Sequence, residues 1–298
     1  MHIDQIRGAL NSLDPRWATP ERIRLLSELS PLYEGNGVLR DGFAPSLQEC
    51  CPDRAQCWAQ AAGRLQPVAP ADCGPGQIGS IAWPWIGDQY ERPGGVCLVA
   101  LNINAADAEW WAAPAEEYAI AGQVIDGLSR GRKQIWPPSS FHYRSLASAL
   151  ALLASADGAE PSVTPTPEET ATAMHRTARI QAVKCSPLAE KSNPTQEMRV
   201  NCPSRFAQHE LGVLRPGSLL ALGVEARAAV ELLGDVAWDE ATSDFHRGSV
   251  AIAAGRCEVF VLPHPNSWGS RWPHGQVALV KSLLERPLPA DSGALSPA

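Results

Sequence analysis

Long apolar runs are missing from this sequence. No stretch reaches about 18 consecutive apolar residues, the length at which a segment becomes a candidate for crossing a membrane. The first residues, MHIDQIRGALNSLDPRW, also lack the basic start and the apolar core of a secretory signal. We therefore expect a cytoplasmic protein without a membrane partner.

An excess of positive charge is missing too. The chain holds 25 Lys and Arg against 32 Asp and Glu, so its formal net charge is −7. This balance argues against a protein that coats nucleic acid over a broad surface, although it allows one local basic groove. Basic residues do gather in three places along the chain: Arg130, Arg132 and Lys133; Lys184, Lys191, Arg199 and Arg205; and Arg256, Arg271 and His274.

Cysteine, by contrast, is frequent. Eight cysteines in a cytosolic protein favour metal ligands or core residues over disulfides. Cys97 and Cys257 lie within apolar runs, and we expect both in the core. The other six form an early group and a later pair: Cys50, Cys51, Cys57 and Cys73, then Cys185 and Cys202.

Short apolar segments between turn signals predict buried β-strands. Four such segments occur, at 95–101, 180–184, 218–223 and 258–262. Helical patterns alternate with them: SLASALALLASA (145–156), TPEE (166–169), VEARAAVELL (224–233) and GQVALVKSLLER (275–286). This alternation predicts an α/β fold, a three-layer α/β/α sandwich around a central, mostly parallel four-stranded sheet.

The domain organisation follows from the same pattern. Residues 1–45 are expected to form a helical N-terminal extension, with a helix at TPERIRLLSELSPLY (19–33). Residues 46–288 then form the α/β domain, and 289–298 a disordered tail. Ligands of parallel sheets bind at the carboxyl ends of the strands. We expect the residues at these ends to share one edge: Asn102, Gln181, Gly223 and His264.

Four motifs in the second half of the chain together resemble those of a known enzyme family. They are VKCSPLAEKSNPTQE (183–197), Cys202, LRPGSLLALG (214–223) and the HPNS segment that begins at His264. In order and spacing they resemble the iron–sulfur branch of the uracil-DNA glycosylase superfamily, over roughly residues 46–288. The resemblance implies a glycosylase-like α/β domain and a monomeric enzyme that acts on DNA, with no obligate protein partner.

The terminal motif implies several roles. His264, held between two prolines, would stabilise the charge that develops on a departing base. Asn266 stands where the family has Ser, and Ser267 follows it. Trp268 is the best match for the apolar side chain that fills the gap left by a flipped base. Arg271 would reach a phosphate, as would Lys184 from its basic group.

Three further roles surround the base itself. After the first strand the chain reads ALNIN, so Asn102 falls on the residue that positions the attacking water, and Asp107 is a stronger base and a second candidate. Gln181 stands where the family has a base-reading Asn, with the same donor and acceptor groups on a longer arm. Phe141 matches the aromatic ring that stacks on the base, and Tyr143 lies nearby.

The resemblance also implies a cofactor. Cys185 and Cys202 align with two ligands of a [4Fe–4S] cluster, and Cys57 aligns with a third. Cys51 is the preferred fourth ligand, with Cys50 or Cys73 as alternatives. Zinc bound by four cysteines is the second choice on chemistry alone.

Together these motifs predict a monofunctional DNA glycosylase that flips a pyrimidine nucleotide and leaves an abasic site. The departures from the family surround the base, which favours a modified pyrimidine, for example a glucosylated hydroxymethylcytosine of phage DNA, and a role in phage defence. The alternatives are a uracil-DNA glycosylase of base excision repair and a non-catalytic iron–sulfur module that binds DNA.

Overall fold

The structure is a computed structural model of the 298-residue chain. It describes residues 18–35, 53, 56–57, 84–91, 94–101, 140–184, 194–265 and 271–289. None of the helices in these ranges is both long enough and apolar enough to cross a membrane.

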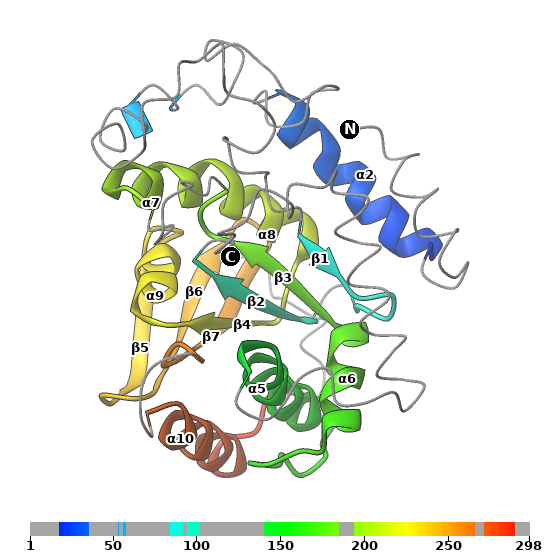
Figure 1. Ribbon diagram of the computed structural model, residues 1–298, viewed down its shortest axis with the longest axis vertical. Coiled ribbons are helices and arrows are strands. Elements are labelled where there is room, and N and C mark those ends of the chain that lie inside the picture. The colour runs from blue at the N-terminus through cyan, green and yellow to red at the C-terminus, as the bar shows by residue number, and fades with distance from the viewer. Residues whose placement is uncertain are drawn as a thin grey trace.

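One mixed sheet of seven strands organises the fold (Figure 1). Its order is β1-β3-β2-β4-β7-β6-β5. The middle strands β3, β2, β4 and β7 are mutually parallel, while β1, β6 and β5 add antiparallel pairs at the two sides. The strands are β1 Trp85–Ile86, β2 Val96–Ala100, β3 Thr177–Gln181, β4 Ser218–Leu222, β5 Val236–Ala241, β6 His246–Ile252 and β7 Gly255–Leu262.

Helices pack on both faces of the sheet (Figure 1). On one face lie α5 Phe141–Ala156, α6 Pro167–Arg176 and α10 Arg271–Glu285. On the other lie α2 Pro20–Gly35, α7 Gln196–Cys202, α8 Gln208–Leu214 and α9 Val224–Glu231. A π-helical turn, η5 Pro203–Ala207, joins α7 to α8. The α/β class is therefore confirmed.

Alternation along the central strands divides the core between the two faces. On β2, Leu98 points to the α5 side, whereas Cys97 and Val99 point to the α8 side. Because both faces are covered, β2 and β4 are buried along their whole length and contain almost no polar residue. Cys97 and Cys257 are both buried in the α8-side core, as the sequence predicts.

The sequence predicted all four central strands but not the full width of the sheet. The prediction of a four-stranded sheet is wrong, since seven strands pair. β3 also begins at Thr177, three residues before the predicted start at Ile180, because the strand follows α6 without a loop. Its hydrogen bonding to the β2 segment nevertheless continues past Gln181, since Ala182 N donates to Ala100 O at 2.7 Å.

The helix starts follow their capping signals. Thr166 and Glu169 form a reciprocal capping box at α6, with Glu169 N to Thr166 Oγ1 at 3.2 Å and Thr166 N to Glu169 Oε2 at 2.6 Å. Ser140 caps α5 by accepting from Tyr143 N at 3.1 Å, so this helix begins at Phe141. Phe141 is therefore the first residue of α5 and lies near the carboxyl ends of the parallel strands.

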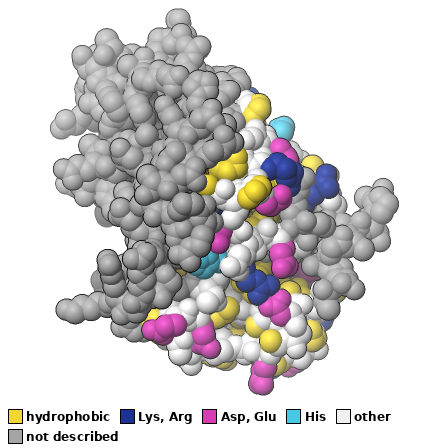
Figure 2. All heavy atoms as spheres, turned by 90° about the vertical axis from the view of Figure 1, so that its right-hand side faces the viewer, with side chains coloured by type: hydrophobic (Ala, Val, Ile, Leu, Met, Phe, Trp, Pro, Cys, Tyr) yellow, Lys and Arg dark blue, Asp and Glu magenta, His cyan; other side chains and the backbone are white. Residues whose placement is uncertain are grey.

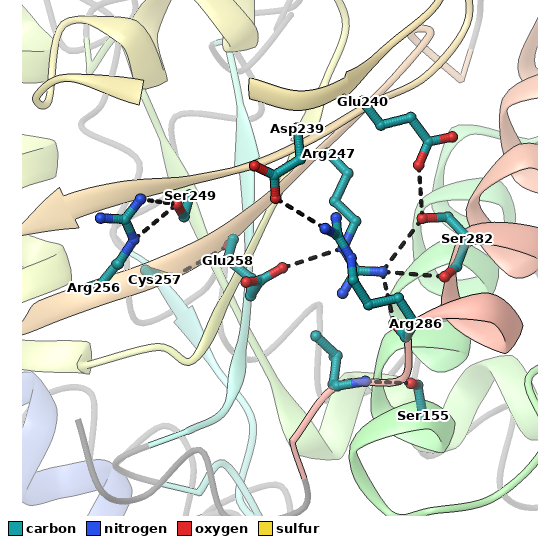
Figure 3. Close-up of polar contacts among 11 residues, drawn as sticks. Ser155, Asp239, Glu240, Arg247, Ser249, Arg256, Cys257, Glu258, Ser282 and Arg286 are labelled. Atoms are coloured by element: carbon teal, nitrogen blue, oxygen red, sulfur yellow. Dashed lines mark hydrogen bonds and ion pairs between the residues drawn. The ribbon is translucent and has the colours of Figure 1, made fainter. Parts of the chain in front are cut away.

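A buried arginine joins the antiparallel part of the sheet to α10 (Figure 3). The Arg247 side chain on β6 is 2% exposed and donates from Nε to Glu258 on β7 at 3.2 Å. Its Nη1 donates to the carbonyl oxygens of Ser282, at 3.1 Å, and Arg286, at 2.7 Å. The guanidinium also lies 5.2 Å from the centre of the Phe260 ring.

Replacing this arginine tests how much the network contributes. We expect Arg247→Met to lower the free energy of unfolding by about 2–4 kcal/mol, because the carbonyl oxygens of Ser282 and Arg286 and the carboxylate of Glu258 lose a donor. Urea unfolding followed by tryptophan fluorescence measures the change. Arg256→Met is the matched control, since Arg256 on β7 is exposed and, among the described residues, bonds Ser249 alone; its cost should stay below about 0.5 kcal/mol. Equal costs for the two variants would contradict a role for the network.

Candidate functional site

The carboxyl ends of the four parallel strands meet at one edge of the sheet. Ala100 pairs in register with Gln181, and Leu222 pairs with Leu262. Gly223 follows Leu222 directly, and His264 lies two residues beyond Leu262. The expected gathering of Gln181, Gly223 and His264 along one edge is therefore confirmed, while Asn102 lies outside the described residues.

Gly223 and His264 approach each other closely. Gly223 has a φ of 99° and donates its N–H to Leu262 O at 2.8 Å. A Cβ at this glycine would lie 3.1 Å from the Cβ of His264. The position therefore needs glycine both for its backbone conformation and for the space that His264 occupies.

Phe141 and His264 form the centre of the site. Their ring centroids are 5.4 Å apart and the rings are tilted by 39°. Phe141 is partly buried and His264 is exposed, so both rings keep accessible surface. Burial of part of the imidazole lowers the pKa of His264 below its usual value. The ring is therefore mainly neutral at pH 7 and carries one N–H donor.

An arginine on β3 connects this aromatic pair to Gln181. Arg179 places its guanidinium carbon 5.3 Å from the centre of the Phe141 ring. With the Gln181 amide oxygen turned toward it, Arg179 donates to that oxygen from Nη2 at 3.0 Å and from Nε at 3.3 Å. Sequence reasoning missed Arg179. The signal that could have found it is a charged residue two positions before Gln181, on the same face of a strand.

His142 flanks the aromatic pair. Its ring meets Phe141 edge-on at a centroid distance of 5.6 Å. The protein around the imidazole, together with the positive charge of Arg179, lowers the pKa of His142 to about 4. A second imidazole at this edge of the sheet is therefore neutral at pH 7.

Arg144 holds the backbone beyond His264. It lies one turn after Phe141 on α5 and donates from Nη1 to the carbonyl oxygen of Pro265. Its guanidinium carbon also lies 5.3 Å from the centre of the Trp272 ring on α10. One helix thus supplies the aromatic ring and restrains the loop that carries His264.

Tyr143 lies away from this group of rings. It is buried with Ala147 and Trp272, and its hydroxyl donates to Pro165 O at 2.5 Å. The structure therefore gives Tyr143 a packing role between α5 and α10, and it does not place this ring with Phe141 and His264.

Lys184 is engaged inside the protein. Its Nζ lies 2.6 Å from both carboxylate oxygens of Glu210, and the two side chains are 1% and 0% exposed. An ammonium held in this way is not available to a phosphate. The pair instead ties the segment that follows β3 to α8, on the face of the sheet away from α5. Lys184 directly precedes Cys185 in the sequence.

Arg271 and the other described basic side chains are largely paired with acids. Arg271 donates from Nε to Asp244 at 2.9 Å and from Nη2 to Ser243 O at 2.9 Å. Arg199 pairs with Glu225, and Arg205 pairs with Asp53 at 2.6 Å. On the face shown in Figure 2, basic and acidic side chains of the described residues are interspersed.

Two of the predicted cluster ligands, Cys57 and Cys202, lie beside α7 and at its end. Cys202 is the last residue of this helix, and Asn201 before it donates to Cys57 Sγ at 3.5 Å. At the other end of α7, Thr195 Oγ1 donates to Cys57 O at 2.9 Å. Both cysteines are buried, at 4% and 5% exposure.

The remaining expected residues lie outside the part of the chain that the structure describes. They are Asn102, Asp107, Asn266, Ser267, Trp268, Cys51 and Cys185, with the alternatives Cys50 and Cys73. Within the described residues, no three His, Cys, Asp or Glu side chains come together as a metal site would require. The described residues thus include two of the four predicted ligands, Cys57 and Cys202, while the other two lie outside them.

Comparison with known proteins adds no family assignment: no protein-family model matches the chain, and no curated protein matches it.

The buried ion pair gives a stability prediction. Lys184→Met should lower the free energy of unfolding by about 3–5 kcal/mol, because Glu210 would stay buried without its counter-ion. The double variant Lys184→Met/Glu210→Leu should recover much of this loss. As a control, Lys281→Met removes an exposed contact to Glu285 and should cost about 0.5 kcal/mol or less. A double variant no more stable than Lys184→Met would contradict this account.

His142 predicts a component of acid sensitivity. Its pKa rises from about 4 in the folded protein to the ordinary value of 6.5 on unfolding, so the unfolded state binds more protons between these values. Stability contributed by the neutral ring is present above pH 6.5 and is lost as the pH falls toward 4. The unfolding free energy of wild type should therefore fall relative to that of His142→Gln as the pH is lowered from 6.5 toward 4, because only wild type carries the titrating ring. Parallel curves would contradict the prediction.

Proposed function

We propose that this protein is a DNA glycosylase that flips a pyrimidine nucleotide and hydrolyses its N-glycosidic bond. One observation carries the proposal. Phe141, Gln181 and His264 come from a helix and two different strands, and they gather at the carboxyl edge of the parallel sheet. The motif resemblance assigns these three positions to stacking, reading and leaving-group stabilisation, with Gln181 in place of the family's Asn.

The reaction requires few groups. Water attacks C1′ of the flipped nucleotide, a C–O bond forms, and the bond from C1′ to the base nitrogen breaks. The base leaves with the electron pair and takes up a proton, and an abasic sugar remains. Asn102 or Asp107 would hold the water, Asp107 as the stronger base.

His264 suits the stabilisation of the leaving base. Negative charge spreads onto the base oxygen as the glycosidic bond breaks, and a fixed N–H donor lowers the energy of that charge. A neutral imidazole can donate this bond without giving up its proton. The lowered pKa of His264, the close approach of Gly223 and the Arg144 bond to Pro265 all support such a fixed, neutral donor.

Phe141 and Gln181 would hold the base before cleavage. Stacking of a base on an aromatic ring contributes about 1–3 kcal/mol and does not depend on base identity. The amide of Gln181 supplies the hydrogen bonds that distinguish one base from another. Trp268 would fill the gap in the duplex, with Asn266 and Ser267 beside the base and the backbone.

A [4Fe–4S] cluster is the proposed cofactor. Cys57 and Cys202 fit this proposal because two segments distant in sequence bring them to one buried place beside α7. Cys51 and Cys185 would complete the set of thiolates, as in other cysteine-ligated clusters. The cluster would fix the segment around Cys57 against α7, and the Arg205–Asp53 pair supports the same docking.

The substrate would be a modified pyrimidine, with glucosylated hydroxymethylcytosine in phage DNA as one candidate and phage defence as the role. Support comes from the residues that depart from the family pattern around the base, Gln181 and Asn266 among them. Uracil excision in repair is the alternative.

A panel of DNAs tests the reaction. Purified protein is incubated with DNA that contains uracil, deaminated purines, hydroxymethylcytosine or glucosylated hydroxymethylcytosine, and alkali-labile sites are counted. We expect abasic sites from one substrate class, reduced about 100-fold or more in His264→Ala. The matched control is His274→Ala, an exposed histidine on α10, which should act like wild type.

Two results would overturn the proposal. Wild-type activity in His264→Ala would remove the histidine from the reaction. Binding of DNA without cleavage of any substrate would favour the non-catalytic module instead.

The cofactor has its own test. The anaerobically purified protein should absorb at about 400 nm and contain about four iron atoms per chain. Cys57→Ser and Cys202→Ser should lose most of this absorption, whereas the buried core variant Cys257→Ala should keep it. Stoichiometric zinc with no absorption in this region would establish the second choice of metal.

A further inference from the structure

Arg179 occupies an unusual position for a charged side chain. Thr177, Arg179 and Gln181 alternate along β3 on the face that packs against α5, and Arg179 is in register with the buried Leu98 of β2. A guanidinium at this place needs hydrogen-bond acceptors or an aromatic surface close by. The structure supplies both: the amide oxygen of Gln181 and the ring of Phe141.

The contact with Gln181 removes an ambiguity from the amide. The oxygen and nitrogen of a glutamine amide exchange places by a half-turn that hardly changes its shape. A glutamine side chain that contacts a base can therefore present either a donor or an acceptor. Arg179 carries donors only. Two of its N–H groups point at one amide atom, which must therefore be the oxygen, and the NH₂ takes the other position.

The contact with Phe141 couples the same guanidinium to the stacking ring. At 5.3 Å from the ring centre, Arg179 is within the range of a cation–π interaction. A single side chain thus restrains two groups that come from α5 and from the end of β3. Neither Phe141 nor Gln181 can shift without loss of one of these contacts.

We propose that Arg179 is a positioning residue that fixes the Gln181 amide as a hydrogen-bond donor and holds Phe141 beside it. The base edge that meets Gln181 then carries an acceptor, as the 4-oxo group of uracil-type pyrimidines does, and an exocyclic 4-amino group is disfavoured. This specificity rests on the proposed function, because it concerns the base in that same site. It narrows that function, since it favours a modified pyrimidine of the 4-oxo type over the glucosylated hydroxymethylcytosine named there as one candidate.

The experiment compares bases that differ only at C4. Oligonucleotides carry 5-hydroxymethyluracil or 5-hydroxymethylcytosine, each as the cleavable nucleotide and as its non-hydrolysable 2′-fluoroarabino form. Abasic-site formation gives kcat/KM for the first pair, and fluorescence anisotropy gives Kd for the second. Wild type, Arg179→Met, Arg179→Lys and Gln181→Glu are measured. Arg176→Met, which loses the ion pair to Asp157 at the end of α6, is the matched control.

We expect wild type and Arg176→Met to prefer the 4-oxo base about tenfold, the discrimination that one oriented hydrogen bond gives. Arg179→Met should lower this ratio to about threefold or less, and Arg179→Lys should keep part of it because a cation remains. In Gln181→Glu the carboxylate pairs with Arg179 and offers no donor, so the preference should disappear even though Arg179 is present. Thermal unfolding of each variant separates loss of fold from loss of preference.

The outcomes separate the two proposals. Preference in the binding assay without any abasic product would overturn the glycosylase reaction and leave the role of Arg179 supported. Full preference in Arg179→Met, preference for the 4-amino base, or equal treatment of both bases by wild type in both assays would overturn the role of Arg179.

Discussion

Parallel pairing of β3, β2, β4 and β7 is the constraint on which the rest of this protein depends. Parallel strands cannot be joined by tight turns, so each connection has to run back along a face of the sheet. The helices of both outer layers are those connections or lie beside them. The same pairing brings every carboxyl end to one edge, where Ala100 and Gln181, 81 positions apart in the sequence, become neighbours.

Burial on both faces then determines which charges the fold can hold. Arg22 donates to Ile86 O at 2.6 Å and lies 4.9 Å from the centre of the Trp85 ring, which docks α2 on β1. Lys184 joins the end of the β3 segment to α8, and Arg247 joins β6 to α10. In each case the cation connects a helix with a strand or with the segment that follows one. Apolar packing does not fix the orientation of a helix on a sheet, whereas these hydrogen bonds and ion pairs do.

The central strands and the helix starts could be predicted because their signals are local. A buried strand is a continuous apolar run, and the Thr166 capping box is a pattern of four residues. β5 and β6 could not be predicted in the same way. β5 carries Asp239 and Glu240 and alternates between exposed and partly buried residues, while β6 contains glycine, serine and a buried arginine. Their stability comes from pairing with β7 and from the Arg247 network, which connects residues far apart in sequence.

The site shows the same division. Gly223 and His264 could be placed at one edge because each follows an apolar strand, and Gln181 lies there because β3 ends at this residue. Lys184 was expected to contact a phosphate because several basic residues close together in the sequence suggest an exposed basic surface. Its actual partner, Glu210, is 26 positions away in the sequence, so no local pattern indicates the pair. Arg179 went unnoticed for the related reason that a charge inside a strand suggests exposure. The orientation of the Gln181 amide depends on that same arginine, so the chemistry offered to a ligand is set by a residue that need not touch it.

The acidic balance of the chain bears on how such a site would meet DNA. Arg199, Arg205 and Arg271 are each paired with a carboxylate, so a phosphate that approaches one of them exchanges one anion for another. An exchange of this kind releases fewer counter-ions than contact with unpaired cations, and binding would then vary less steeply with salt than in a basic protein. Under the proposed function, these three arginines would therefore add little to the affinity for DNA, and the flipped base and its stacking at the edge of the sheet would contribute more. This agrees with a site in which Phe141, Gln181 and His264 are held in place by Arg179, Arg144 and Gly223 before any ligand arrives.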